Sequence, residues 1–225
     1  MIALIDYGIS NLRSVQKACE QLGVEVTLAG TPAQLAQAER LILPGVGAFR
    51  AGMDGLRVRG LIEPIQQAVC TGKPLLGICL GMQLLFDASA ELGDTAGLGL
   101  LPGQVTKIKM QDAGGTRQET SHSSLVTHHS SLVTRHALKI PHMGWNQLDL
   151  VRNHPLVRGL ETGTYAYFVH SYAVYPEDNR IVIATTDYGG PFASIVGRGP
   201  LCGVQFHPEK SQAVGLRLLQ NFLEM

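Results

Sequence analysis

The sequence predicts an α/β fold: an open, mixed and mostly parallel central sheet with helices on both faces, and a smaller antiparallel part. Two observations predict it. Strand-like and helix-like segments alternate through about the first 90 residues, and from about residue 98 the chain continues mainly as short strands. Such alternation is typical of a parallel sheet covered by helices. No linker-like composition separates the two parts, so residues 1–225 are expected to form one domain.

The elements of the first part follow from their apolar runs. Strands are expected at residues 2–5, 24–28, 41–43 and 74–79. Helices are expected at about 11–22, 32–38, 54–70 and 80–88. Because each strand is followed by a helical segment, neighbouring strands are expected to run parallel.

The second part is a series of strands with a closing helix. The strands are expected at 103–110, 138–150, 164–175, 180–187, 192–197 and 201–206, and the helix at 211–224. A stretch at about 111–137, rich in Gly, Ser, Thr and His, interrupts this series, and within it HSSLVT recurs with a period of seven. We expect a flexible, exposed insertion enlarged by duplication; a metal site formed by its histidines is the alternative.

Composition excludes several functional classes. Eighteen basic and eighteen acidic residues cancel, so no charged field favours nucleic acid or an anionic membrane. The four cysteines, 19, 70, 79 and 202, form no C-x-x-C pair, which indicates neither a disulfide scaffold nor a metal centre, and no cofactor is expected. No apolar run approaches the roughly 20 residues of a membrane-spanning helix. A reducing cytoplasm is the expected location.

The stretch PLLGICLGMQLLF places Cys79 between Gly77 and Gly81, where a strand-like run becomes helical. This Gly-x-Cys-x-Gly spacing is the thiol version of the nucleophile elbow, a sharp turn that lifts the nucleophile above the sheet. A free cysteine, with a pKa of about 8.5, is mostly protonated near neutrality and needs a base. The alternative is that Cys79 is a small buried apolar residue.

A candidate base lies in GVQFHPEK. Residues two apart on an extended chain point to the same side, so Glu209 can orient the imidazole of His207. Cys79, His207 and Glu209 are therefore the predicted catalytic residues. The backbone N–H of Leu80 would stabilise an oxyanion, and a second donor is expected at Val46 or Gly47 in LPGVGAF. That loop is otherwise an ordinary strand-to-helix turn.

The motifs GICLGMQ and GVQFHPE resemble those of the class I, triad-type glutamine amidotransferases. More narrowly, IDYGISNLRSVQKA, LPGVGAF, PHMGWN and YFVHSYAV are similar to the glutaminase subunits of imidazole glycerol phosphate synthases, and the likeness spans nearly the whole chain. The resemblance implies a flavodoxin-like fold. It further implies that glutamine is hydrolysed to glutamate and ammonia through a γ-glutamyl thioester on Cys79. The glutamine-binding residues it implies are Gln83, Glu91, His170, Ser171 and Tyr172.

The resemblance also implies a partner in histidine biosynthesis. This is a (β/α)8-barrel cyclase subunit that receives ammonia through a channel and makes imidazole glycerol phosphate and AICAR, as one half of a heterodimer. Five residues are implied at the interface: His142, Met143, Trp145, Asn146 and Lys210. The alternative is a turn with a packed tryptophan and a solvated lysine. If the PGVG backbone must reorient to present its donor, glutaminase activity depends on the loaded partner.

Two departures from the family pattern are visible. Ser10 stands where the family usually has glycine, and the insertion at about 111–137 is longer than usual. Three other functions remain open at this point. They are an amidotransferase for anthranilate, purine, guanylate or pyridoxal phosphate synthesis, an α/β-hydrolase with a cysteine nucleophile, and a non-catalytic interaction module with the same fold.

Overall fold

The computed structural model describes residues 1–8, 11–109 and 139–225. The position of Ser10 and the predicted insertion at about 111–137, with its repeat, lie outside these ranges. No helix of the described residues is long and apolar enough to cross a membrane.

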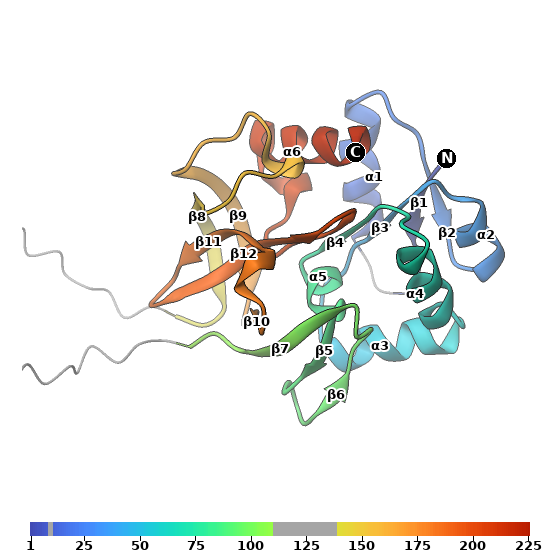
Figure 1. Cartoon of the computed structure of the whole chain (residues 1–225), viewed down its shortest axis with the longest axis horizontal. Coiled ribbons are helices and arrows are strands. Elements are labelled where there is room, and N and C mark those ends of the chain that lie inside the picture. The colour runs from blue at the N-terminus through green and yellow to red at the C-terminus, as the bar shows by residue number, and fades with distance from the viewer. Residues whose placement is uncertain (9–10, 110–138) are drawn as a thin grey trace, which may run out of the picture.

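A large sheet runs through the molecule (Figure 1) in the order β2-β1-β3-β4-β13-β12-β11-β8-β9. The first five strands are parallel: β2 (Val26–Ala29), β1 (Ile2–Ile5), β3 (Arg40–Leu43), β4 (Leu75–Ile78) and β13 (Leu201–Val204). The others pair antiparallel: β12 (Pro191–Arg198), β11 (Val182–Asp187), β8 (His142–Leu150) and β9 (Thr164–His170). The predicted mixed sheet is confirmed, with four parallel and four antiparallel pairings between neighbouring strands.

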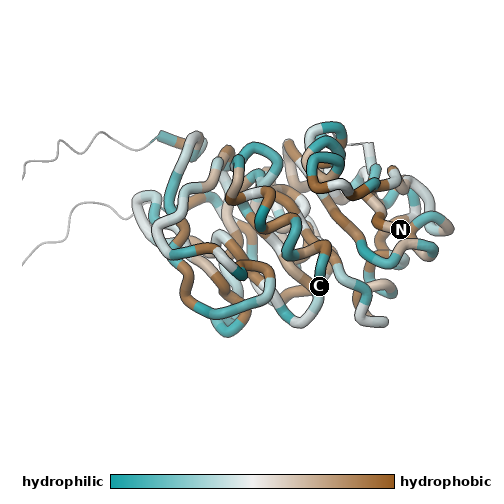
Figure 2. The backbone as a smooth tube through the Cα atoms, turned by 90° about the horizontal axis from the view of Figure 1, so that it is seen from above, coloured by the Kyte–Doolittle hydropathy of each residue, from teal (hydrophilic) through white to brown (hydrophobic). Residues whose placement is uncertain are grey.

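Helices cover both faces of this sheet because its strands are apolar on both sides. Along β1, Ile2 and Leu4 belong to one buried cluster, whereas Ala3 and Ile5 belong to the other. The helices α1 (Leu12–Gln21) and α6 (Gln212–Glu224) close the first cluster, and α2 (Pro32–Gln37), α3 (Phe49–Val58), α4 (Ile62–Cys70) and α5 (Leu80–Leu84) close the second. Figure 2 accordingly shows hydrophobic stretches of the backbone in the middle of the molecule.

A second sheet has the order β10-β7-β5-β6. Its strands are β10 (Tyr172–Pro176), β7 (Leu101–Lys107), β5 (Phe86–Ser89) and β6 (Thr95–Ala96). Three short 3-10 helices complete the elements: η1 (Pro155–Val157), η2 (Asn179–Ile181) and η3 (Pro208–Lys210). The chain passes from the large sheet to the small one at Ser171, between β9 and β10.

Three predicted elements were wrong in extent. The helix expected at 54–70 is interrupted by Gly60, which has a φ of +64° and separates α3 from α4. The helix expected at 80–88 ends at Leu84, because the following residues pair with β7 as strand β5. The strand expected at 164–175 is two strands, since β9 pairs with β8 and β10 pairs with β7.

The topology brings distant loops together. In the parallel half, the chain leaves β3, β4 and β13 at the same edge of the sheet, and these three strands are neighbours. The segment after β3 contains Val46 and Gly47, the residue after β4 is Cys79, and the segment after β13 contains His207 and Glu209. Ligand sites of open α/β sheets form at this edge.

Candidate active site

Cys79 occupies a strained turn between β4 and α5. Its φ is +54° and its ψ is −109°, a backbone conformation that side chains other than glycine rarely adopt. A Cβ on Gly77 would lie 2.7 Å from the carbonyl oxygen of Gly81, and a Cβ on Gly81 would lie 1.7 Å from that of Leu43. Both glycines are therefore required by close backbone packing, as the elbow interpretation predicts.

The imidazole of His207 pairs with the carboxylate of Glu209. The Nδ1 to Oε1 distance is 2.7 Å, and the side chains are 1% and 0% exposed. The mutual orientation was predicted from an extended chain, but β13 ends at Val204 and Glu209 lies in η3, so a turn brings the two groups together. Asn11, which the sequence did not single out, donates from Nδ2 to the same carboxylate oxygen at 2.5 Å.

The second ring nitrogen of His207, Nε2, is not engaged by Glu209. Burial lowers the pKa of His207, but its interactions with Cys79 and Glu209 outweigh burial and raise that pKa to about 10. Nε2 itself is buried without a hydrogen-bond partner among the described residues. Nε2 is therefore the ring nitrogen left to exchange a proton with the thiol, whose own hydrogen-bond contacts are to Gln205 and Val169.

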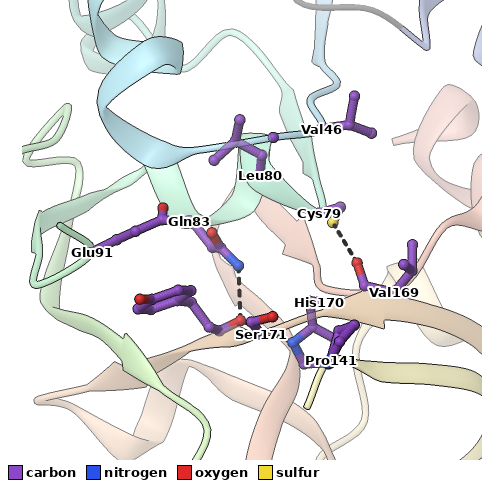
Figure 3. A pocket seen from close by; sticks show the side chains of 11 residues that line it. Val46, Cys79, Leu80, Gln83, Glu91, Pro141, Val169, His170 and Ser171 are labelled. Carbon is purple, nitrogen blue, oxygen red and sulfur yellow. Dashed lines mark hydrogen bonds between the residues drawn. The ribbon is translucent and has the colours of Figure 1, made fainter.

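Two groups contact the sulfur of Cys79 within hydrogen-bond range. The side-chain amide of Gln205 donates from Nε2 at 3.7 Å, and the carbonyl oxygen of Val169 lies 4.0 Å away. Figure 3 shows the sulfur turned towards that carbonyl. Sequence reasoning missed Gln205, although it stands two residues before His207 in the same motif.

A cavity of about 410 Å³ opens beside Cys79. Nine predicted residues line it: Val46, Gly47, Cys79, Leu80, Gln83, Glu91, His170, Ser171 and Tyr172. Pro141 and Val169 complete the lining (Figure 3). The elbow thus faces a pocket large enough for an amino acid, and the buried side chains of His207 and Glu209 do not line it.

Gln83 and Glu91 are tied to the protein as well as exposed to the pocket. The Nε2 of Gln83 donates to the carbonyl of Tyr172 at 2.9 Å and to Oε1 of Gln205 at 3.1 Å. The carboxylate of Glu91 accepts from the backbone N–H of Phe49 at 2.7 Å, at the start of α3. The Oε1 of Gln83 and the second carboxylate oxygen of Glu91 are the atoms left to meet a ligand.

The predicted oxyanion donors are not both available. The backbone N–H of Leu80 donates to the carbonyl of Gly45 at 3.3 Å, across the loop that follows β3. Tyr7 holds the same loop, because its hydroxyl donates to the carbonyl of Pro44 at 2.6 Å. Gly47 has a φ of +98° and no atom within 4 Å of an added Cβ, so its peptide has room to turn.

A line of hydrogen bonds joins β8 to the pocket wall. The carbonyl of Tyr172 can only accept, so the 2.9 Å contact requires a proton on Nδ1 of His170. The Nε2 of His170 then accepts from Nδ1 of His142 at 3.0 Å, and Asn146 donates to Nε2 of His142 at 3.2 Å. Burial lowers the pKa of His142 to about 4 and that of His170 to about 3, so both rings are neutral at pH 7.

The five predicted interface residues do not share one surface. Met143 and Trp145 are 63% and 46% exposed, and Lys210 is exposed with its ammonium group 5.8 Å from the ring centre of Tyr167. His142 is only 2% exposed and Asn146 is partly buried, because alternate residues of β8 face opposite sides of the sheet. His142 is thus buried in this chain, and its contact with the partner stays a prediction.

No arrangement in residues 1–8, 11–109 and 139–225 brings together three or more His, Cys, Asp or Glu side chains in a way that could hold a metal ion. The four histidines of the repeat region, His122, His128, His129 and His136, lie outside those ranges.

The family model for "Glutamine amidotransferase class-I" matches residues 3–225. The chain is 49% identical over 225 residues to "Imidazole glycerol phosphate synthase subunit HisH" of Syntrophotalea carbinolica, with all of both chains covered. It is also 49% identical to the subunit of the same name from Salinibacter ruber, covering 99% of this chain and 93% of that one. This chain belongs to the class I glutamine amidotransferases, among the HisH subunits. The enzyme class predicted from the sequence, the glutamine amidotransferase subunit that serves histidine biosynthesis, is confirmed.

Solved structures agree on the fold. "Crystal structure of glutamine amidotransferase" matches all of this HisH-family chain and 98% of the other, with a TM-score of 0.69 and 20% identity. "Structure of PurLQS from Thermotoga maritima" matches with a TM-score of 0.67 and 21% identity, covering 99% of this chain and 97% of that one. At these identities the likeness extends to the fold alone, and it bears out the predicted mixed sheet flanked by helices.

Proposed function

We propose that Cys79, His207 and Glu209 hydrolyse glutamine in this chain. The proposal rests on one observation: the thiol of a strained elbow faces a cavity, with a buried imidazole–carboxylate pair behind it. The raised pKa of His207 favours transfer of the thiol proton to Nε2. Glu209 orients the ring through Nδ1 and stabilises its charged form.

The reaction then follows in two stages. The thiolate adds to the amide carbon of glutamine, and His207 returns the proton to the leaving nitrogen as the C–N bond breaks, which releases ammonia and leaves a γ-glutamyl thioester. Water adds next, with His207 taking its proton, and the C–S bond breaks to give glutamate and the free thiol. Gln83, Glu91 and the segment from His170 to Tyr172 hold the substrate, because they line the cavity opposite Cys79.

A glutamine-mimicking chloroketone tests the nucleophile. We expect the reagent to modify Cys79 alone, mapped by peptide mass spectrometry, with free glutamine protecting it. Cys70 is exposed and provides the matched control: Cys70→Ser should keep labelling and glutaminase activity, whereas Cys79→Ser should lose both. Labelling at Cys70 in place of Cys79 would refute the assignment.

We further propose that a (β/α)8-barrel cyclase in the cytoplasm consumes the ammonia, delivered through a channel within a heterodimer. An exposed surface made of Met143, Trp145, Tyr165 and Lys210 on and beside the β8–β9 edge supports this docking site. Trp145→Ala should weaken association with the cyclase, measured by titration calorimetry. Val58→Ala removes an exposed apolar residue from α3, where no docking is proposed, and it should leave association unchanged.

Coupling between the subunits is proposed at the loop after β3. The N–H of Leu80 is occupied by the carbonyl of Gly45, so this loop must move before an oxyanion can be stabilised. Glutamine hydrolysis should therefore be slow in the isolated chain and rise when the cyclase binds its own ligand. A fast basal rate that loaded cyclase does not change would contradict the coupling, while leaving the nucleophile assignment intact.

A further inference from the structure

Gln205 lies between the end of β13 and the histidine of the active site. Its side chain is fully buried, yet it belongs to no apolar cluster. Its amide bridges two pocket residues, with Nε2 3.7 Å from the sulfur of Cys79 and Oε1 3.1 Å from Nε2 of Gln83. A buried amide in this position requires an explanation, because an apolar side chain would fill the same volume without two polar contacts.

The orientation of the Gln205 amide follows from a backbone carbonyl. The carbonyl of Tyr172 has no hydrogen to donate, so the atom of Gln83 that contacts it at 2.9 Å must be the NH2 group. The same NH2 group contacts Gln205, so the facing atom of Gln205 must be its oxygen. The NH2 group of Gln205 is therefore the one that faces the sulfur.

The backbone keeps this amide in place. The carbonyl of Val204, the residue before Gln205, accepts from the N–H of Cys79 at 2.8 Å, which continues the pairing of β4 with β13. The N–H of Gln205 in turn donates to the carbonyl of Ser194 on β12 at 2.9 Å. The donor and the sulfur are thus attached to adjacent strands in fixed register, so their contact does not depend on a mobile loop.

We propose that Gln205 is a positioning residue that donates an N–H to the Cys79 sulfur, aims it at the pocket and favours its ionised form. The inference rests on the proposed glutaminase function. A thiolate is a stronger acceptor than a thiol, so a fixed donor stabilises the anion more than the neutral group. Gln83 acts through Gln205, because the NH2 group of Gln83 holds the oxygen of the Gln205 amide and leaves the Gln205 nitrogen to face the sulfur.

The pH dependence of Cys79 alkylation by iodoacetamide tests the proposal, followed by mass spectrometry in the complete chain. Gln205→Met keeps the length and volume of the side chain but has no donor, and its alkylation midpoint should rise by about one pH unit, the size of one hydrogen bond to an anion. In the complex with the cyclase, kcat at pH 7 should fall about tenfold with little change in KM, and it should recover as the pH is raised.

A second variant keeps the test possible if Gln205→Met folds poorly. Gln205→Glu keeps an acceptor for Gln83 and replaces the donor by oxygen, so its midpoint should also rise. Ser194→Ala is the matched control, because it keeps the backbone carbonyl that accepts from Gln205 and removes only a buried hydroxyl with no hydrogen-bond partner among the described residues. Its midpoint should equal that of the unmodified chain. Circular dichroism establishes that each variant is folded.

Two outcomes separate this inference from the function on which it rests. If the chloroketone labels Cys79 but the midpoint is unchanged in a folded Gln205 variant, the role of Gln205 is overturned and the nucleophile stands. If the chloroketone does not label Cys79 in the unmodified chain, the proposed function itself fails. A lower activity that does not recover at higher pH would also overturn the role, because it would indicate a purely structural defect.

Discussion

One wall of the pocket, around Cys79 and Leu80, is held by contact between backbones, whereas the opposite wall, from His170 to Tyr172, is held by hydrogen bonds that side chains make to one another and to a backbone carbonyl. On the elbow wall, two glycines allow the backbones to approach so closely that no side chain fits between them. On the opposite wall, neutral histidine rings and an amide form a continuous line. The first wall is rigid because of sterics, and the second depends on protonation states.

The two walls meet at one atom, the carbonyl oxygen of Tyr172. It accepts from Gln83 at 2.9 Å on one side and from His170 at 2.9 Å on the other. The first contact leads through Gln205 to the sulfur, and the second leads through His142 to Asn146 on β8. Because this carbonyl can only accept, it determines the direction of every hydrogen bond along both lines.

Breaking the elbow wall should have the largest effect. In Gly81→Ala, the new Cβ would lie 1.7 Å from the carbonyl of Leu43, so β3 and α5 must separate. We expect a loss of at least about 3 kcal/mol in the free energy of unfolding, measured by urea titration, together with loss of chloroketone labelling.

The control for this prediction is Gly72→Ala. Gly72 has a φ of +82° but no atom within 4 Å of an added Cβ, so the variant experiences only backbone strain, about 1 kcal/mol. Equal losses in the two variants would show that steric contact is not what holds the elbow.

The contrast between the walls also explains what the sequence could and could not predict. The elbow was predictable because Gly77, Cys79 and Gly81 are adjacent in the chain and their spacing alone implies the turn. The contacts of Asn11 with Glu209, and of Gln205 with Cys79, join residues 198 and 126 positions apart, and no local pattern reports them. Their common signal is only a polar residue beside a recognised motif.

The prediction of secondary structure failed where strand pairing in the folded chain decided the outcome. Residues 80–88 form a mostly apolar segment that predicts a single helix, yet Phe86 pairs with Leu101 in the second sheet. The motif alone also does not show that His142 is buried. Strand alternation turns it inward against His170, while Met143 beside it faces outward.

The hydrogen-bonded wall should weaken as the pH falls. The pKa values of His142 and His170 are lowered in the folded chain, so below about pH 6.5 the unfolded chain binds more protons than the folded chain. The folded state is therefore fully stable above that pH and loses stability as the pH falls towards 4 and 3. Each histidine should contribute about 1.4 kcal/mol per pH unit over this window. Urea unfolding at pH 7, 6 and 5 measures the slope.

Two variants show whether His142 contributes to this pH dependence of stability. His142→Gln should remove its share, whereas Asn146→Ala removes a hydrogen bond to the same ring without removing a titrating group. Asn146→Ala should therefore lower stability at pH 7 and leave the slope nearly unchanged. If His142→Gln has the slope of the unmodified chain, His142 is not held neutral in the fold.

The smallest expected effect concerns the hydrogen bond that ties the elbow wall to Tyr7. In Tyr7→Phe the buried carbonyl of Pro44 loses its donor, which should cost about 1–2 kcal/mol in the free energy of unfolding. The loop before Val46 should become looser, so kcat for glutamine hydrolysis should fall while iodoacetamide alkylation of Cys79 keeps its pH midpoint.

Tyr188→Phe is the control. It removes an equivalent hydroxyl-to-carbonyl hydrogen bond, to Lys139, at an exposed position where water replaces the donor, so its cost in the free energy of unfolding should be small. Equal costs at the two tyrosines would mean that this wall gains nothing from the buried hydroxyl and depends on backbone contact alone.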